Sequence, residues 1–245
     1  MISKKIITKS LAFAFVALSS AAVLANPVIQ RVGLVGSGPV GELESFLERA
    51  SSLAGELSPD VTATAVILTN TFHGPVGSND VSIALTFDSL EDWAEATAKQ
   101  RGSSEWQQVL QTFPVDNFTV NFQGLSEVVW STGNATPAAD GNVLLVYGVA
   151  INGGGLAPMM SYLEGVADAA RELGENPTIN LLSPIVAGAG TASANIVVRF
   201  DSAEAWATAS AKQDASRDFQ EAFAKFPAQN YTINYRGMSV ITALE

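Results

Sequence analysis

One stretch of this chain occurs twice, and that duplication limits the possible folds more than any other feature of the sequence. Residues 83–126 align without a gap on residues 196–239, with 20 identities in 44 positions. The tripeptide Phe87-Asp88-Ser89 recurs as Phe200-Asp201-Ser202, and later Phe-Pro, Asn-x-Thr-x-Asn and Gly-x-Ser groups keep the same offset of 113 residues. A fixed offset predicts two copies of one structural unit.

The duplication also indicates how the chain is divided. Upstream of the gap-free region, Phe46-Leu47-Glu48 matches Tyr162-Leu163-Glu164 once small insertions are allowed. The stretch between the two units is small, polar and rich in turn-forming residues, which is typical of a linker. We therefore predict a leader at 1–25, a first repeat at 26–130, a linker at 131–141 and a second repeat at 142–245.

Each unit has the same predicted order of elements. Alternating apolar residues predict strands, and apolar residues at helical spacing predict helices. Asp88 and Asp201 are predicted to cap the second helix of each unit, which ends where Phe-Pro blocks its continuation. The predicted elements are strands at 28–35, 62–72, 81–87 and 118–129 with helices at 42–57 and after 88, then strands at 143–151, 178–186, 195–200 and 231–244 with helices at 157–173 and after 201.

This order is βαββαβ, the split-βαβ or ferredoxin-like arrangement. The two helices of one unit cover only one face of its sheet, so two units can pair the faces left open. The sequence therefore predicts an α+β fold in which two tandem ferredoxin-like repeats form a pseudo-twofold α+β barrel with the helices outside. Because each fused unit covers the open sheet face of the other, this arrangement is consistent with a monomer.

The N-terminus has the form of a secretory signal peptide. Lys4, Lys5 and Lys9 precede a short apolar run, and Val23 and Ala25 are small enough for the −3 and −1 positions of a cleavage site. The apolar run is short for a membrane span, which takes about 20 residues. We therefore expect cleavage after Ala25, a periplasmic or secreted protein, and no membrane association once the leader is removed.

Charge and composition exclude several classes of partner and chemistry. Cleavage would remove three of the 13 basic residues and none of the 24 acidic ones, leaving a net charge of −14 that repels nucleic acid. The chain has no cysteine, which excludes thiol catalysis, iron–sulfur clusters and thiolate zinc sites. Its single histidine, His73, lies in a predicted turn and cannot build a multi-histidine metal site. We expect no metal and no cofactor.

The residues shared by both units resemble a known superfamily. The pattern Phe-Asp-Ser-x-Glu-x-Trp-Ala at 87–94 and 200–207, followed by Lys-Gln and then Trp106-Gln107 or Phe219-Gln220, is similar to the dimeric α+β barrel proteins, including antibiotic-biosynthesis-monooxygenase-like and NIPSNAP-like domains. The resemblance implies a ferredoxin-like fold and a cavity for a small, usually hydrophobic molecule. Its members include cofactor-free oxygenases, haem-degrading enzymes, haem-dependent chlorite dismutases and modules without known chemistry.

Strict alternation along the last strand of each unit separates an apolar face from a polar face. Phe118, Val120 and Phe122 would meet the helices, and the intervening Thr, Asn and Gln would point into the barrel. The polar inner face is a candidate ligand site, in which guanidinium groups bind a carboxylate or phenolate and amides hold its oxygens. The candidate ligand-binding residues are Arg199, Arg236, Asn121 and Asn234. The alternative is a hydrated seam between the two halves.

A glycine-rich segment, Gly36-Ser37-Gly38-Pro39-Val40-Gly41, fits the dinucleotide-binding pattern, but the following strands form an antiparallel hairpin rather than the parallel crossover that pattern needs. We interpret it as a tight turn in which glycine supplies a positive φ. The sequence thus predicts an exported barrel that binds a small anionic or hydrophobic molecule, with cofactor-free oxygenase-type activity as a hypothesis. The alternative is a non-catalytic structural or interaction module of the periplasm.

Overall fold

Eight antiparallel strands close into one barrel in the computed structural model, which describes residues 26–72, 80–133, 138–186 and 193–244. The first repeat contains β1 (Val28–Gly36), α1 (Val40–Leu57), β2 (Ala63–Phe72), β3 (Val81–Phe87), α2 (Leu90–Gly102), α3 (Ser104–Leu110) and β4 (Phe118–Ser131). The second repeat contains β5 (Val143–Ile151), α4 (Ala157–Glu172), β6 (Thr178–Val186), β7 (Ala194–Phe200), α5 (Ala203–Ala215), α6 (Arg217–Phe223) and β8 (Tyr231–Ala243).

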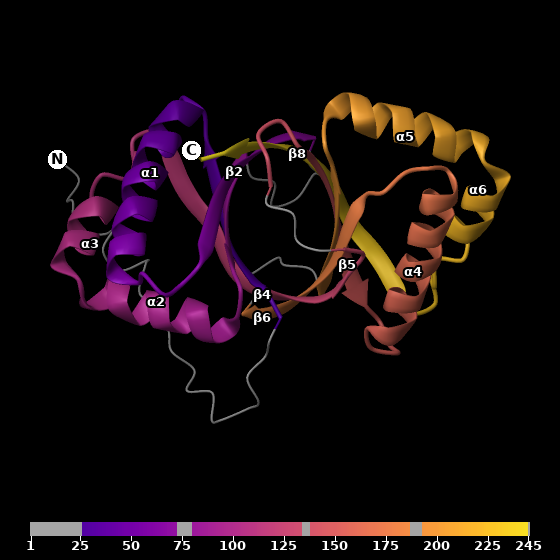
Figure 1. Cartoon of the computed structure of the whole chain (residues 1–245), viewed down its shortest axis with the longest axis horizontal. Coiled ribbons are helices and arrows are strands. Elements are labelled where there is room, and N and C mark those ends of the chain that lie inside the picture. Colours follow the sequence, from indigo (N-terminus) through magenta and orange to yellow (C-terminus); the bar gives the residue numbers. More distant parts are fainter. Residues whose placement is uncertain (1–25, 73–79, 134–137, 187–192, 245) are drawn as a thin grey trace.

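The strand order around the barrel is β1-β3-β2-β8-β5-β7-β6-β4. Two seams join the repeats, because β2 pairs with β8 and β4 pairs with β6. Helices α1, α2 and α3 lie on one side of the barrel, and α4, α5 and α6 lie on the other (Figure 1). The predicted pseudo-twofold α+β barrel with outer helices is therefore the observed fold.

The main hydrophobic core lies between the barrel wall and the helices, once in each repeat. In the first repeat Leu43, Phe46 and Leu47 of α1 pack against Leu34 and Ile67 of the sheet. In the second repeat Met159 and Leu163 of α4 make the matching contacts. Alternation along the strands sends these apolar side chains outward and leaves the other set facing the barrel axis.

The second helical segment of each repeat differs from its prediction in two ways. The N-caps are Ser89 and Ser202, whose hydroxyls accept hydrogen bonds from the backbone N–H groups of Asp92 and Ala205, so the predicted aspartate caps were wrong by one residue. The segment is also broken in two, because an extended serine ends one helix and caps the next. These breaks fall at Ser103 between α2 and α3, and at Ser216 between α5 and α6.

The glycines that follow β1 serve close packing. A Cβ at Gly36 would lie 2.0 Å from the backbone oxygen of Asn117, and one at Gly38 would lie 2.5 Å from the Asn117 Cβ. Neither residue has a positive φ, so that part of the interpretation was wrong here. Positive φ is found instead in the second repeat, where Gly154 and Gly155 have φ of 78° and 67°.

The described end of the linker packs at one end of the barrel. Ala138 packs against an apolar cluster inside the barrel, and the Asn142 amide donates to the carbonyl oxygen of Asp201 at 3.0 Å. The same side chain accepts a hydrogen bond from the Ala139 backbone at 3.0 Å. Among the described residues, the helices are all too short or too polar to cross a membrane.

Candidate functional site: the barrel interior

A β-bulge near the start of each final strand decides which side chains enter the barrel. In β4 the partner of Gly33 is Phe122 but the partner of Leu34 is Val120, so Asn121 is the extra, bulged residue. Phe118 and Val120 therefore face the helices as predicted, whereas Phe122 faces the barrel interior and Gln123 faces the helices. The prediction that strict alternation continues through this strand was wrong because a single bulge reverses the faces beyond it.

The same bulge recurs in β8 at Asn234 and moves a candidate site residue to the opposite face. Gly148 pairs with Tyr235 and Val149 pairs with Ile233. Arg236 pairs with Tyr147, a helix-side residue, and its guanidinium lies over the Tyr147 ring at 5.8 Å from the centroid. Arg236 is exposed on the helix side, so the predicted inner-face position of Arg236 was wrong.

The other three predicted ligand residues occupy different parts of the barrel. Asn121 and Asn234 are exposed at the two bulges, near the end of the barrel opposite the linker. Arg199 of β7 is partly buried and pairs with Leu144 and Thr178, both on the inner face. The structure therefore does not bring the four residues together, and their role in ligand binding stays a prediction.

Arg199 is a partly buried cation on the inner face of the barrel. Burial lowers the pKa of its guanidinium, and the nearby negative charge of Asp201 acts in the opposite direction. Desolvation penalises the charged form of a base, so this cation is less well hydrated than one on the surface. A partly desolvated guanidinium at the linker end of the interior fits the predicted anchoring role.

The interior also holds Arg31 of β1, which the sequence analysis missed. Its Nη2 donates to the Ser82 hydroxyl at 3.1 Å, and its guanidinium lies over the Phe122 ring at 5.3 Å from the centroid. Its Nε is buried and has no hydrogen-bond partner in the described structure. The signal was present in the sequence, because Val28, Gln30, Val32 and Leu34 alternate with Arg31 and face the helices.

The corresponding place in the second repeat has different chemistry. Tyr235 takes the position of Phe122, and its hydroxyl donates to the Asn195 Oδ1 at 2.7 Å. Its ring lies against Gly148, where an added Cβ would come within 2.0 Å of the Tyr235 Cε1. Val146 takes the position of Arg31, since it pairs with Gly237 as Arg31 pairs with Gly124. At this level of the barrel the first repeat thus presents a cation and the second a neutral pair, while Arg199 of the second repeat lies at another level.

Among the described strands no inward-facing carboxylate lies beside Arg31, whereas Arg199 is near Asp201, which directly follows β7. Glu127 is the single acidic residue within the eight strands, and it pairs with Val28 on the helix side. Its Oε1 accepts a hydrogen bond from the Asn26 side chain at 2.7 Å. An anion entering the barrel would therefore meet guanidinium groups and no strand carboxylate.

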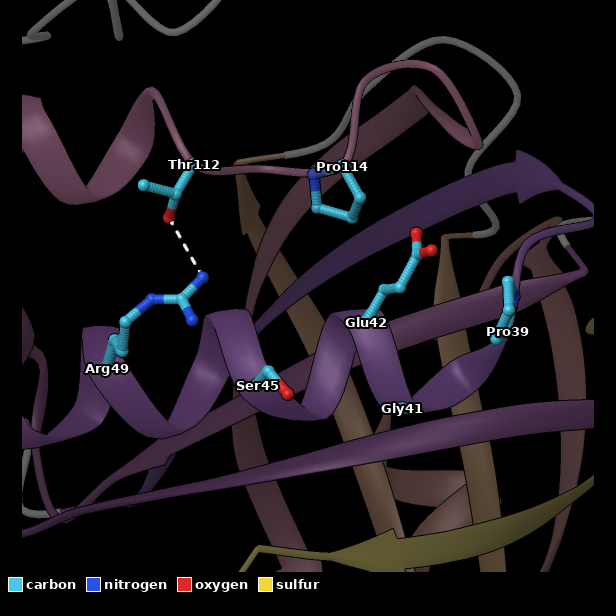
Figure 2. Close-up of a pocket in the computed structure, with 7 residues that line it drawn as sticks. All are labelled: Pro39, Gly41, Glu42, Ser45, Arg49, Thr112 and Pro114. Atoms are coloured by element: carbon cyan, nitrogen blue, oxygen red, sulfur yellow. Dashed lines mark hydrogen bonds between the residues drawn. The ribbon is translucent and has the colours of Figure 1, made fainter.

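Two grooves of ligand size lie outside the barrel, at matching places in the two repeats. The first has a volume of about 440 Å³, between α1 and the turn that follows α3 (Figure 2). Its polar groups are already paired, because the Arg49 Nη2 donates to the Thr112 hydroxyl at 3.1 Å and the Asn117 amide donates to Glu42 at 2.6 Å. The groove is lined by Pro39, Gly41, Glu42, Ser45, Arg49, Thr112 and Pro114.

The second groove has a volume of about 410 Å³ and is more aromatic. Tyr162 lines it and packs edge-on against Phe226, with ring centroids 5.4 Å apart. Burial, together with the neighbouring Tyr147, raises the pKa of Tyr162 to about 12, so its phenol is a weak acid here. In the described residues, His, Cys, Asp and Glu side chains nowhere gather in a group of three that could hold a metal ion.

His73 and the predicted leader at 1–25 lie outside the described residues. Arg49 and Lys225, which lie in the two grooves, were not considered as candidates from the sequence. No repeated polar motif marks them, because Gly165 stands where Arg49 would recur and Thr112 stands where Lys225 would recur. The grooves could therefore be found only from the packing of the helices.

Comparisons with known proteins agree on the fold. No protein-family model matches the chain, and no curated protein matches its sequence. Among solved structures, an anthrone oxidase-like protein is 16% identical with a TM-score of 0.53, covering 89% of this chain and 92% of that one. A protein provisionally named a monooxygenase from Fusobacterium nucleatum subsp. nucleatum is 9% identical with a TM-score of 0.54, covering 90% of this chain and 94% of that one.

A further protein provisionally named a monooxygenase, from Lactobacillus acidophilus, is 9% identical with a TM-score of 0.53, covering 90% of this chain and 95% of that one. Likeness across nine-tenths of each chain, at such low identity, concerns the backbone and not the site. Together with the closed eight-stranded barrel, these structures establish the ferredoxin-like α+β barrel fold that the shared motifs implied.

Proposed function

We propose that this protein is an exported α+β barrel that binds a small anionic molecule inside the barrel. The observation that carries the proposal is Arg31, an inner-facing guanidinium whose buried Nε has no hydrogen-bond partner among the described residues, while Glu127, the one carboxylate within the described strands, faces the helices. A buried cation needs a counter-charge or hydrogen-bond acceptors, and a bound anion supplies both.

The inner face also offers polar groups that can orient a ligand. Ser82 and Asn195 lie at matching places on β3 and β7, and Phe122 and Tyr235 supply apolar surface beside them. A few placed polar groups among apolar side chains is the usual composition of a small-molecule site. Ala138 packs against the apolar cluster at one end, so we expect the ligand to enter from the other end, where Asn121 and Asn234 lie.

We propose oxygenase-type chemistry as the activity of this site. Support comes from the names of structural neighbours, an anthrone oxidase-like protein and two provisional monooxygenases, and from the chemistry of guanidinium groups. An activated CH₂ group conjugated with a carbonyl loses a proton to water and forms an enolate, whose oxygen a guanidinium stabilises. Reaction with O₂ then converts CH₂ to a carbonyl and releases the second oxygen atom as water.

Native mass spectrometry of the chain from Asn26 to Glu245, recovered from an exporting bacterial host, tests binding and export together. We expect an N-terminus at Asn26 and an extra mass that is lost in the Arg31→Met, Arg199→Met double variant. Arg236→Met is the matched control, because this arginine also lies over an aromatic ring but outside the barrel. Retention of the extra mass by the double variant would refute an interior site.

The reaction is tested with an anthrone, whose CH₂ group lies beside aromatic rings and opposite a carbonyl. We expect O₂ uptake with one molecule of quinone formed per O₂, without added metal or flavin, and a slower rate in the double variant. The alternative, a non-catalytic module, is supported by the apolar cluster of Leu68, Ala84 and Ile241, which fills one end of the barrel. An unchanged rate in the double variant would favour that alternative.

A further inference from the structure

We infer that Arg31 is the carboxylate-binding residue of the barrel, and that the ligand carries a single carboxylate that meets the buried edge of this guanidinium. The inference rests on the proposed function in one respect, namely that the ligand lies in the barrel interior. It goes beyond that function by naming the residue and the ionised group that it recognises.

Arg31 is held in one orientation by its neighbours. The hydroxyl of Ser82, a residue with no exposed surface, accepts from Nη2 at 3.1 Å. The Phe122 ring lies against the guanidinium, with its centroid 5.3 Å from Cζ, and attracts the positive charge through its π face. A guanidinium fixed on two sides loses little conformational freedom when a ligand binds, so its binding geometry exists beforehand.

The remaining edge of the guanidinium lacks an acceptor. Nε is buried and makes no hydrogen bond with the described residues. A buried donor left unpaired costs roughly 1–3 kcal/mol, so most proteins satisfy such a group. The planar fork of arginine matches the two oxygens of a carboxylate, which can take Nε–H together with a terminal N–H of the same side chain.

The size and charge of the surroundings favour a monocarboxylate. Gly124, the neighbour of Arg31 on β4, carries no side chain beside it, and Ala84, its neighbour on β3, packs into the apolar cluster with Leu68 and Ile241. Since one guanidinium balances one negative charge, a monocarboxylate leaves the pair neutral, whereas a dianion such as phosphate would leave a buried negative charge. Arg199 is near Asp201 and lies toward the linker end, so it does not supply the second charge at this place.

The second repeat has no such site, so the barrel takes one ligand and not two. Val146 replaces Arg31 at the matching place, and its side chain has no donor. The Tyr235 hydroxyl and Asn195 already satisfy each other at 2.7 Å. A symmetric backbone therefore carries an asymmetric ligand site, with the carboxylate on the first-repeat side.

The experiment follows the Arg31 Nε–H signal by NMR in the full mature chain labelled with ¹⁵N. The chain contains seven arginines, and the signal of Arg31 is the one that Arg31→Lys removes. Benzoate is the probe, benzamide is its uncharged isostere, and inorganic phosphate is the dianion. We expect benzoate to shift the Arg31 signal saturably, benzamide and phosphate to leave it in place, and Arg31→Lys to weaken benzoate binding at least tenfold.

Each other result overturns the inference in a recognisable way. Equal shifts from benzoate and phosphate would make this a general anion site. Movement of the Arg199 signal instead, with unchanged affinity in Arg31→Lys, would leave an interior ligand site standing but would remove Arg31 from it. If no probe moves either signal, the carboxylate site is refuted. The proposed function would still stand if the extra mass seen in the native mass spectrum were lost in Arg199→Met alone.

Folding of the variants is controlled in two ways. Arg31→Val copies the residue found at the matching place in the second repeat, and it should fold where a polar replacement does not. Arg236→Met removes a guanidinium from an aromatic face outside the barrel and should bind benzoate like the parent chain. The shift in the parent protein requires no variant to fold, so the central result stands on the native chain.

Discussion

The two repeats have the same strand order and the same bulges, yet their aromatic residues differ. All four tyrosines of the chain lie in the second repeat: Tyr147, Tyr162, Tyr231 and Tyr235. Three of them replace phenylalanines of the first repeat, so the first repeat places a cation over Phe122 where the second places a hydroxyl on Asn195. Duplication preserved the frame of the barrel and left its interior free to diverge.

That difference distinguishes side chains that stabilise the fold from side chains that are available to bind a ligand. Some positions between the sheet and the helices keep the same chemistry in both repeats; for example, Leu43 corresponds to Met159 and both are fully buried. Inward-facing positions exchange arginine for valine and phenylalanine for tyrosine without changing the strand pairing. The two repeats therefore share their strand pairing while differing at individual side chains, Arg31 among them.

The largest effect on stability is expected when matched core side chains of the two repeats are removed. We expect Leu43→Ala and Met159→Ala each to lower the free energy of unfolding by about 2–5 kcal/mol, since both leave a cavity between a helix and the barrel. Chemical denaturation should show one transition in both variants, because the repeats share one sheet. Two separate transitions would show that the repeats are stabilised independently.

The next test concerns the glycine beneath Tyr235. Gly148→Ala places a methyl group 2.0 Å from the Tyr235 Cε1, so the ring must move and the variant should lose about 1–3 kcal/mol of stability. In a Tyr235→Ala background the same change should cost much less. Additive effects in the double variant would show that the two residues do not compete for space.

A smaller effect is expected when the second repeat is made to resemble the first. Tyr235→Phe copies Phe122 and removes the hydrogen bond to Asn195, which should lower stability by about 1 kcal/mol. Tyr162→Phe copies Phe46 and serves as the control, because its hydroxyl makes a longer, 3.3 Å bond to an exposed carbonyl. If Tyr162→Phe lowers the free energy of unfolding more than Tyr235→Phe does, the interior hydrogen bond is not the stronger of the two.

The smallest expected effect is a pH dependence confined to the second repeat. The pKa of Tyr162 is raised to about 12, from about 10 for a solvated tyrosine. Because the folded pKa exceeds the unfolded one, the contribution of Tyr162 to stability is complete below about pH 10 and is lost as the pH rises toward about 12. Phenolate absorbance should show a late-titrating tyrosine that disappears in Tyr162→Phe; an unchanged titration would contradict the assignment.

Much of the fold could be predicted because it depends on local patterns. Alternation gives the strands, helical spacing gives the helices, and the duplication gives the paired sheets. The breaks at Ser103 and Ser216 were harder, because a helix that ends and restarts at one serine keeps nearly the same spacing of apolar residues. Capping chemistry was visible in the sequence, but Asp88 and Asp201 were equally acceptable as caps.

The candidate site was less predictable for a specific physical reason. A bulge adds one residue without any change in composition, so Asn121 and Asn234 look like ordinary members of an alternating strand. That one residue moves Arg236 outside and Tyr235 inside. Arg31 lies in β1 before any bulge in that strand, and its inward direction could have been predicted from its neighbours.

The seam between β2 and β8 sets the order in which the barrel can assemble. Val66 pairs with Ala243, so this contact encloses residues 66–243, which are most of the chain. Contacts between residues far apart in sequence carry a high loop-closure cost and form late in folding. Until β2 and β8 pair, both are unpaired sheet edges that can form the same pairing with another copy of the chain. Two chains that meet at this stage can exchange repeats and form a domain-swapped dimer, in which the β2–β8 and β4–β6 pairings form between the chains.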